Sequence, residues 1–161
     1  MKKILKGRDK VKKYCKIVIY TLLVILTMSY IFSNSLQSSE ISNGRSGKIV
    51  EFISSIINNK IPKETLNIII RKLAHGTEFA ILGVFLGLLT YEISKLRKQA
   101  IISFPLLISL CTAVTDEFIQ SFNNRSESIK DILIDFGGAI SGLLIISLVL
   151  LLIKKYRRIR F

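Results

Sequence analysis

Long apolar runs constrain this chain more than any other feature of its sequence. Half of its 161 residues are hydrophobic, and most of these fall into four blocks. As a helix, each block is about long enough to cross a bilayer. A soluble domain of this length would intersperse its apolar residues with polar ones. We therefore predict an all-α integral membrane protein, a four-helix bundle in which residues 1–161 form a single domain. Its membrane-crossing helices are expected at approximately residues 15–36, 67–91, 100–120 and 132–153.

Basic residues are concentrated at the ends of the apolar runs. Of the 24 lysines and arginines, 16 lie in residues 1–16, 92–98 and 154–161, together with two of the 11 acids. Four crossings place these three segments on one side, which the positive-inside rule makes the cytoplasmic side. We therefore expect cytoplasmic N and C termini, the lipid bilayer as the partner of this charge, and no nucleic acid. A basic start before an apolar run also suits a signal peptide, but no small-residue cleavage site follows, so we expect an uncleaved helix.

The longest polar stretch separates the first two apolar runs. Its beginning, SSEISNGRSG, is rich in Ser, Asn and Gly and predicts a loop. At approximately residues 47–59, apolar residues then recur every three or four positions, which predicts an amphipathic helix on the extracytoplasmic side. Lys60 and Pro62 are expected to end this helix. Its apolar face either lies on the membrane surface or packs against the bundle.

Ionisable and amide side chains interrupt the apolar runs at the end that this topology places outside the cytoplasm. Such residues are costly in a bilayer, which makes them candidates for function. Spacings of three and four residues place Arg71, His75 and Glu78 on one helix face. Ser33 is expected to join them from the first helix. The candidate catalytic residues are His75, Glu78, Asp116 and Glu117. The candidate substrate-binding residues are Gln37, Arg71, Lys72, Gln120, Arg125, Asp131 and Asp135.

Several of these side chains also have purely structural explanations. Lys72 can extend to lipid headgroups, and Asp131 can interact with the dipole at a helix N-terminus. Asp116 and Glu117 are adjacent, and the spacing does not determine which of them turns inward. Elsewhere, a small-residue pair at Gly83 and Gly87 predicts the close approach of another helix.

Three motifs, in this order, resemble those of the VanZ-like family. The family motifs are FSxQ, then RKxAHxxEYxxLG, and then a long block that begins DExxQ and ends DxxGxxxG. This chain has FSNSLQ, RKLAHGTEFAILG and DEFIQSFNNRSESIKDILIDFGGAISG, so the resemblance extends from residue 32 to residue 142, over most of the chain. It departs from the family where Phe79 replaces a common Tyr, where FSNSLQ is longer than FSxQ, and where Asn123 and Asn124 replace a frequent Pro-Gly turn. Asn also suits turns, so the last change is mild.

The resemblance implies a small multi-pass protein of the bacterial plasma membrane. The namesake of the family is associated with low-level resistance to the glycopeptide teicoplanin, which does not define a reaction. We therefore expect a site that acts on or binds a cell-envelope lipid, glycan or lipoglycopeptide and contributes to such resistance. The alternatives are a membrane-embedded enzyme acting on an envelope lipid or glycan, with His75 as the general base, and a structural accessory subunit of a membrane complex. A divalent metal bound by His75 with Glu78, Asp116 or Glu117 suits this chemistry, although no motif specifies a metal, and the oligomeric state is left open.

Overall fold

Five helices account for nearly all of the chain in the computed structural model. The model describes residues 2–37, 39–58, 60–97, 99, 102–122 and 128–160, with the backbone alone at 2–10, 39–43, 45 and 159. The helices are α1 (Lys2–Ser35), α2 (Ser39–Ile56), α3 (Lys63–Arg97), α4 (Ser103–Ser121) and α5 (Ile129–Ile159). The described residues contain no strand. The prediction of an all-α protein is therefore confirmed.

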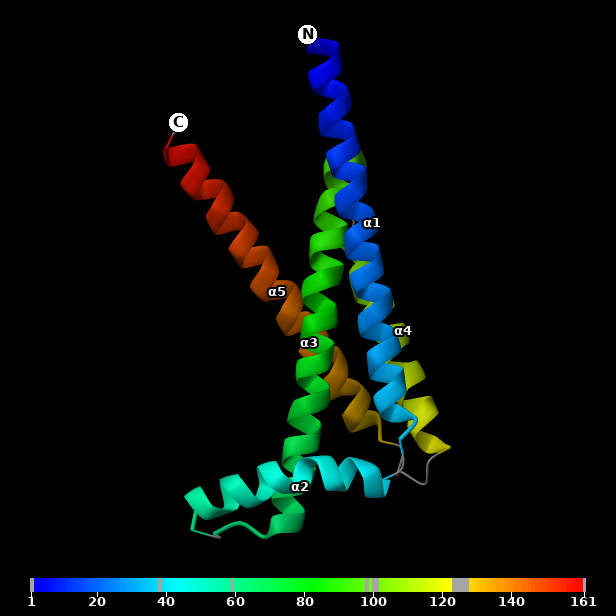
Figure 1. Ribbon diagram of the computed structural model, residues 1–161, viewed down its shortest axis with the longest axis vertical. Helices are drawn as coiled ribbons and strands as arrows, with labels where there is room; N and C mark the ends of the chain where they lie inside the picture. Colours follow the sequence, from blue (N-terminus) through cyan, green and yellow to red (C-terminus); the bar gives the residue numbers. More distant parts are fainter. Residues whose placement is uncertain are drawn as a thin grey trace.

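Helix α3 lies at the centre of the arrangement and contacts each of the other four helices. Its most extensive contact is with α5, followed by α1. Figure 1 shows α1 and α3 running side by side along the long axis, with α5 crossing α3 at a steep angle. Helix α2 lies across one end of the molecule, and both chain termini lie at the opposite end. The end that carries α2 is also the end at which the polar residues gather.

Three helices are long and apolar enough to cross a membrane within the described part of the chain. They are Val11–Ser35 of α1, Lys63–Arg97 of α3 and Ile129–Arg158 of α5. Helix α4, expected as a fourth crossing, has 19 residues and is not among them. Its polar side chains are buried against α1, α3 and α5, among them Ser109, Thr112 and Asp116. A helix whose polar face meets protein has less need of an apolar surface all round.

Helix α2 begins earlier than its sequence predicts. The segment SSEISNGRSG was expected to form a loop, but α2 begins at Ser39, so that expectation was wrong for residues 39–47. Packing on α3 compensates for the weak helix formers, because one face of α2 buries Ser46, Val50 and Ser54 at four-residue intervals. Helix α2 ends at Ile56, and Asn58 follows with φ 53°, a left-handed conformation that Asn tolerates.

Three large apolar residues of α2 are not buried against the bundle. They lie on another face of the helix, where Ile49 is 51%, Phe52 66% and Ile56 63% exposed. Helix α2 therefore combines the two arrangements that its sequence left open. It packs on α3 through a narrow face of small residues, and it keeps an apolar face free for a membrane surface.

Small residues allow α3 and α5 to approach until their backbones touch. A Cβ atom built on Gly83 would overlap the Ala139 carbonyl, and a Cβ atom on Gly138 would overlap the Gly76 carbonyl. At Gly142 the Ala80 carbonyl occupies the same space. The predicted close approach of a helix near Gly83 is thus confirmed, and the helix that approaches is α5.

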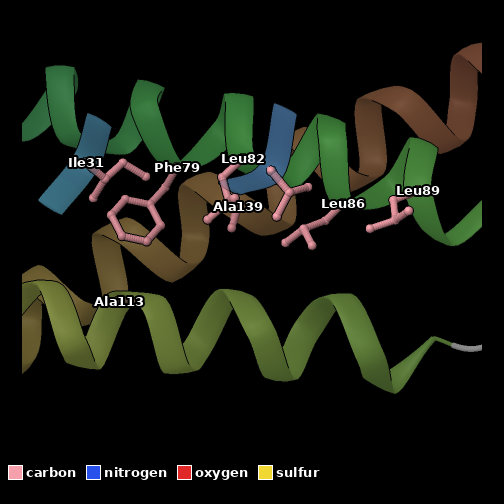
Figure 2. Packing of buried hydrophobic residues seen from close by; sticks show 8 residues of the cluster. Ile31, Phe79, Leu82, Leu86, Leu89, Ala113 and Ala139 are labelled. Carbon is pink, nitrogen blue, oxygen red and sulfur yellow. The ribbon is translucent and has the colours of Figure 1, made fainter. Parts of the chain in front are cut away.

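The buried apolar core lies mainly along one side of α3. Figure 2 shows the side chains of α3 extending in a row towards α4, with Ile31 of α1 and Ala139 of α5 beside them. The cluster consists of Val24, Ile31, Phe79, Leu82, Leu86, Leu89, Ala113 and Ala139. Phe79, Leu82 and Leu86 are fully buried. On α3 this core begins at Phe79, directly after Glu78, the last polar residue of the site on that helix, and it holds α3 against its neighbours.

Candidate functional site

Asp116 of α4 is a fully buried carboxylate held by hydrogen bonds to both oxygens. The Ser35 hydroxyl at the end of α1 donates to Oδ1 at 2.6 Å. The Gln120 amide, one turn further along α4, donates to Oδ2 at 2.7 Å. Both donors are neutral, so they orient the carboxylate without neutralising its charge. The last turn of α1 and the last two turns of α4 thus fix one acid inside the bundle.

His75 of α3 and Asp135 of α5 lie next to Asp116. His75 Nδ1 is 3.8 Å from Asp116 Oδ2, which is beyond hydrogen-bonding distance but within range of an ion pair if the ring is protonated. Asp135 is 2% exposed. One nitrogen of His75 and one carboxylate oxygen of each acid lie within 4.8 Å of one another. Three helices therefore contribute one residue each to a buried cluster.

A cavity of about 320 Å³ lies between α1, α2 and α3, and His75 is part of its wall. Polar side chains from all three helices line it, namely Tyr30, Asn34, Gln37, Ser46, Arg71, His75 and Glu78. The Asn34 amide donates to Glu78 Oε1 at 2.9 Å, which links α1 to α3 across the cavity wall. The predicted face of Arg71, His75 and Glu78 is confirmed, because all three residues line this space.

A second hollow lies next to the cavity, along α1 and α3. Its volume is about 210 Å³, and it shares Tyr30 and Glu78 with the cavity. The rest of its lining is largely apolar and comprises Leu23, Leu26, Thr27 and Ile81. A cavity lined by polar side chains at the α2 end is therefore adjacent to an apolar hollow nearer the middle of the helices.

The remaining predicted acids lie where α5 begins. Glu117 is 5% exposed, and its Oε1 accepts a hydrogen bond of 2.6 Å from the backbone N–H of Ser128, at the N-terminus of α5. Asp131 pairs with Lys72 on α3, and both side chains are partly exposed. Asp116 and Glu117 are thus both buried, on neighbouring faces of α4. Lys72 has a protein partner instead of extending to lipid headgroups.

The candidate residues fall into three groups in space. Gln37, Arg71, His75 and Glu78 line the cavity, while His75, Asp116, Gln120 and Asp135 form the buried cluster. Lys72, Glu117 and Asp131 tie the beginning of α5 to α3 and α4. Arg125 lies outside the described residues. Among the candidates that the structure describes, His75 alone belongs to both the cavity and the cluster.

Part of the contribution of α1 to the site was not predicted from the sequence. Ser33 was predicted to belong to the site but is exposed, whereas Asn34 and Ser35 form hydrogen bonds within it. The first apolar run is apolar on every side, so its pattern does not show which face turns inward. The motif FSNSLQ was the available signal, because it contains both of the residues that were missed.

The fold and the polar groups define a class of protein: an all-helical membrane protein with a histidine, buried acids and an arginine at one end. The chain matches the family model described as VanZ/LLP1 over residues 18–151. It therefore belongs to the VanZ-like family. No curated protein and no solved structure matched the chain.

Proposed function

We propose that the cavity binds the polar headgroup of a cell-envelope amphiphile and that the adjoining hollow accommodates its apolar chain. The observation that carries this proposal is that the two spaces are adjacent and share Tyr30 and Glu78 in their walls. A ligand with a polar end and an apolar end matches a cavity lined by polar side chains beside an apolar hollow. A wholly polar ligand would leave the hollow unused.

The cavity lining suits a headgroup with both charge and hydroxyl groups. Arg71 supplies a guanidinium, which pairs well with phosphate or carboxylate. The amides of Asn34 and Gln37 can both donate and accept hydrogen bonds, as sugar hydroxyls require. Lipid-linked glycans, teichoic acid elements and lipoglycopeptides have this composition. Binding of a lipoglycopeptide would account for protection against teicoplanin.

We place this site on the extracytoplasmic side of the bacterial plasma membrane, with α4 as the fourth crossing helix and both termini in the cytoplasm. The basic segments flanking α1, α3 and α5 support this orientation. The exposed Cys15 allows a direct test. In intact cells a membrane-impermeant maleimide should leave Cys15 unlabelled, and it should label Lys48→Cys on α2 in a chain with both native cysteines replaced. The reverse labelling pattern would contradict the orientation.

Variants of the cavity should separate binding from folding. His75→Ala and Glu78→Gln are each expected to insert normally and to reduce protection against teicoplanin to the level of cells without the protein. Both side chains line the cavity, and their loss removes headgroup contacts. The measurements are the amount of membrane-inserted protein and the inhibitory concentration of teicoplanin and related lipoglycopeptides.

The other end of α3 offers a matched control. Glu92 is 5% exposed and accepts a hydrogen bond from Lys95, far from the cavity. Glu92→Gln makes the same chemical change as Glu78→Gln and should retain protection. Loss of insertion in the cavity variants would favour the structural accessory role instead. If the wild-type protein gives no protection, the contribution to resistance is rejected for this chain.

A second candidate function is an enzyme acting on an envelope lipid or glycan. The observation in its favour is that His75 lines the cavity while its ring faces the buried Asp116, an arrangement in which a carboxylate can orient a histidine base. Turnover would be detected as conversion of purified envelope lipids by mass spectrometry. An enzyme should lose turnover in His75→Ala while still co-purifying with the lipid.

A further inference from the structure

The cluster of His75, Asp116 and Asp135 places two buried carboxylates close together. Asp116 is fully buried and Asp135 is 2% exposed. Two ionised carboxylates at this separation repel each other strongly where water is excluded. The structure must therefore supply either protons or a cation to this point in the bundle.

Within the described part of the chain, Asp116 accepts hydrogen bonds from two neutral side chains, those of Ser35 and Gln120. Lys72 forms an ion pair with Asp131, nearer the beginning of α5. None of these contacts involves Asp135.

Asp135 is the more informative of the two acids. Among the residues that the structure describes, none donates a hydrogen bond to its carboxylate and none forms an ion pair with it. Its buried carboxylate nevertheless lies with an oxygen within 4.8 Å of ligand atoms of His75 and Asp116. The acids Glu78, Glu117 and Asp131 add further negative potential at this side chain. A buried acid without a donor is costly, and either a proton or a bound cation relieves that cost.

We propose that His75, Asp116 and Asp135 together bind one divalent cation, of which Zn²⁺ and Mn²⁺ are the best matched. An imidazole and two carboxylates form a three-ligand set that leaves coordination positions for water or a ligand oxygen. Ligands on a tetrahedral zinc ion lie about 3.4 Å apart, so the side chains need to close in by about an ångström. Ser35 and Gln120 would orient Asp116 towards the ion, as outer-shell residues do.

The backbone already sets the distance between two of the ligands. Gly76, next to His75, touches Gly138, which lies three residues beyond Asp135 on α5. The close approach of α3 and α5 therefore brings the histidine and the acid together independently of any ligand in the cavity. Because His75 also lines the cavity, the cation would lie beside the ligand proposed there.

Metal binding can be tested without knowing the ligand of the cavity. Tag-free protein in detergent is stripped with a chelator and titrated with Mn²⁺ or Zn²⁺. Metal content and thermal unfolding are then measured. Wild-type protein should bind one ion per chain, and its melting temperature should rise with metal concentration. Asp135→Asn should bind at least tenfold more weakly, and its melting temperature should be insensitive to the metal.

The controls distinguish a lost ligand from a lost fold. Without metal, Asp135→Asn should be at least as stable as wild type, because the substitution removes one of two repelling charges. Asp131→Asn, four residues away in the same helix, should retain the ion. Wild-type protein that binds neither metal overturns the proposal, and so does Asp135→Asn protein that binds as wild type does. Neither result affects the headgroup proposal, which depends on the cavity variants.

Discussion

Replacing Gly138 with alanine is expected to destabilise the protein by about 1–3 kcal/mol, the usual cost of forcing extra atoms into a packed interface. The added methyl group would overlap the carbonyl of Gly76, and a backbone atom cannot move aside as a flexible side chain can. The two helices would have to separate at one of the points where their backbones touch, in the most extensive helix contact of the described residues. The expected result is a lower thermal unfolding temperature in detergent.

The adjacent residue provides the control for this experiment. A Cβ atom on Gly137 meets nothing within 4 Å. Gly137→Ala should therefore be neutral or stabilise α5 by up to about 1 kcal/mol, since alanine favours helix more than glycine does. Equal unfolding temperatures for the two variants would show that backbone contact between α3 and α5 does not limit stability.

Replacing Ser35 with alanine is expected to cost about 1.5–3 kcal/mol, the range for a hydrogen bond to a charged group. The Ser35 hydroxyl is fully buried, donates to Asp116 and accepts from Gln120 at 3.3 Å. Alanine would leave a buried carboxylate oxygen without this donor. The free energy of unfolding can be compared with that of Ser33→Ala, two residues earlier and exposed, which should change by less than about 0.5 kcal/mol. Similar losses in both variants would contradict the placement of Ser35 in the site.

The sequence was most informative where polar residues interrupt an otherwise apolar helix. In α3 the spacing of Arg71, His75 and Glu78 fixes a common face, and the structure places all three around one cavity. Apart from Lys72, which pairs with Asp131, the neighbouring residues of this segment are largely apolar. The order of apolar runs and basic segments likewise predicted helices that alternate in direction, with both termini at one end (Figure 1).

The sequence was least informative where neither face of a helix is distinctive. In α1, Ser33 and Ser35 are both serines in an apolar run, and only tertiary packing distinguishes them. In α2, Ser and Gly residues predicted a loop, because helix propensity is a local property. It does not include the stabilisation that these small side chains gain by packing on α3. Asp135 could be placed on a face but not beside His75, since that contact depends on how closely α3 and α5 approach.

The angle between α3 and α5 has a mechanical consequence. Beyond Ile146, which still lies against Gly87, the last part of α5 leans away from α3 (Figure 1), and Leu148, Leu151 and Leu152 are exposed. In a bilayer, acyl chains would fill the wedge between the two helices, so lateral pressure and bilayer thickness act on the angle between them. A change in this angle would rotate α5 about its contact with α3 at the glycines. The long C-terminal part of α5 lies in lipid, and the short N-terminal part carries Asp135, so the rotation would move Asp135.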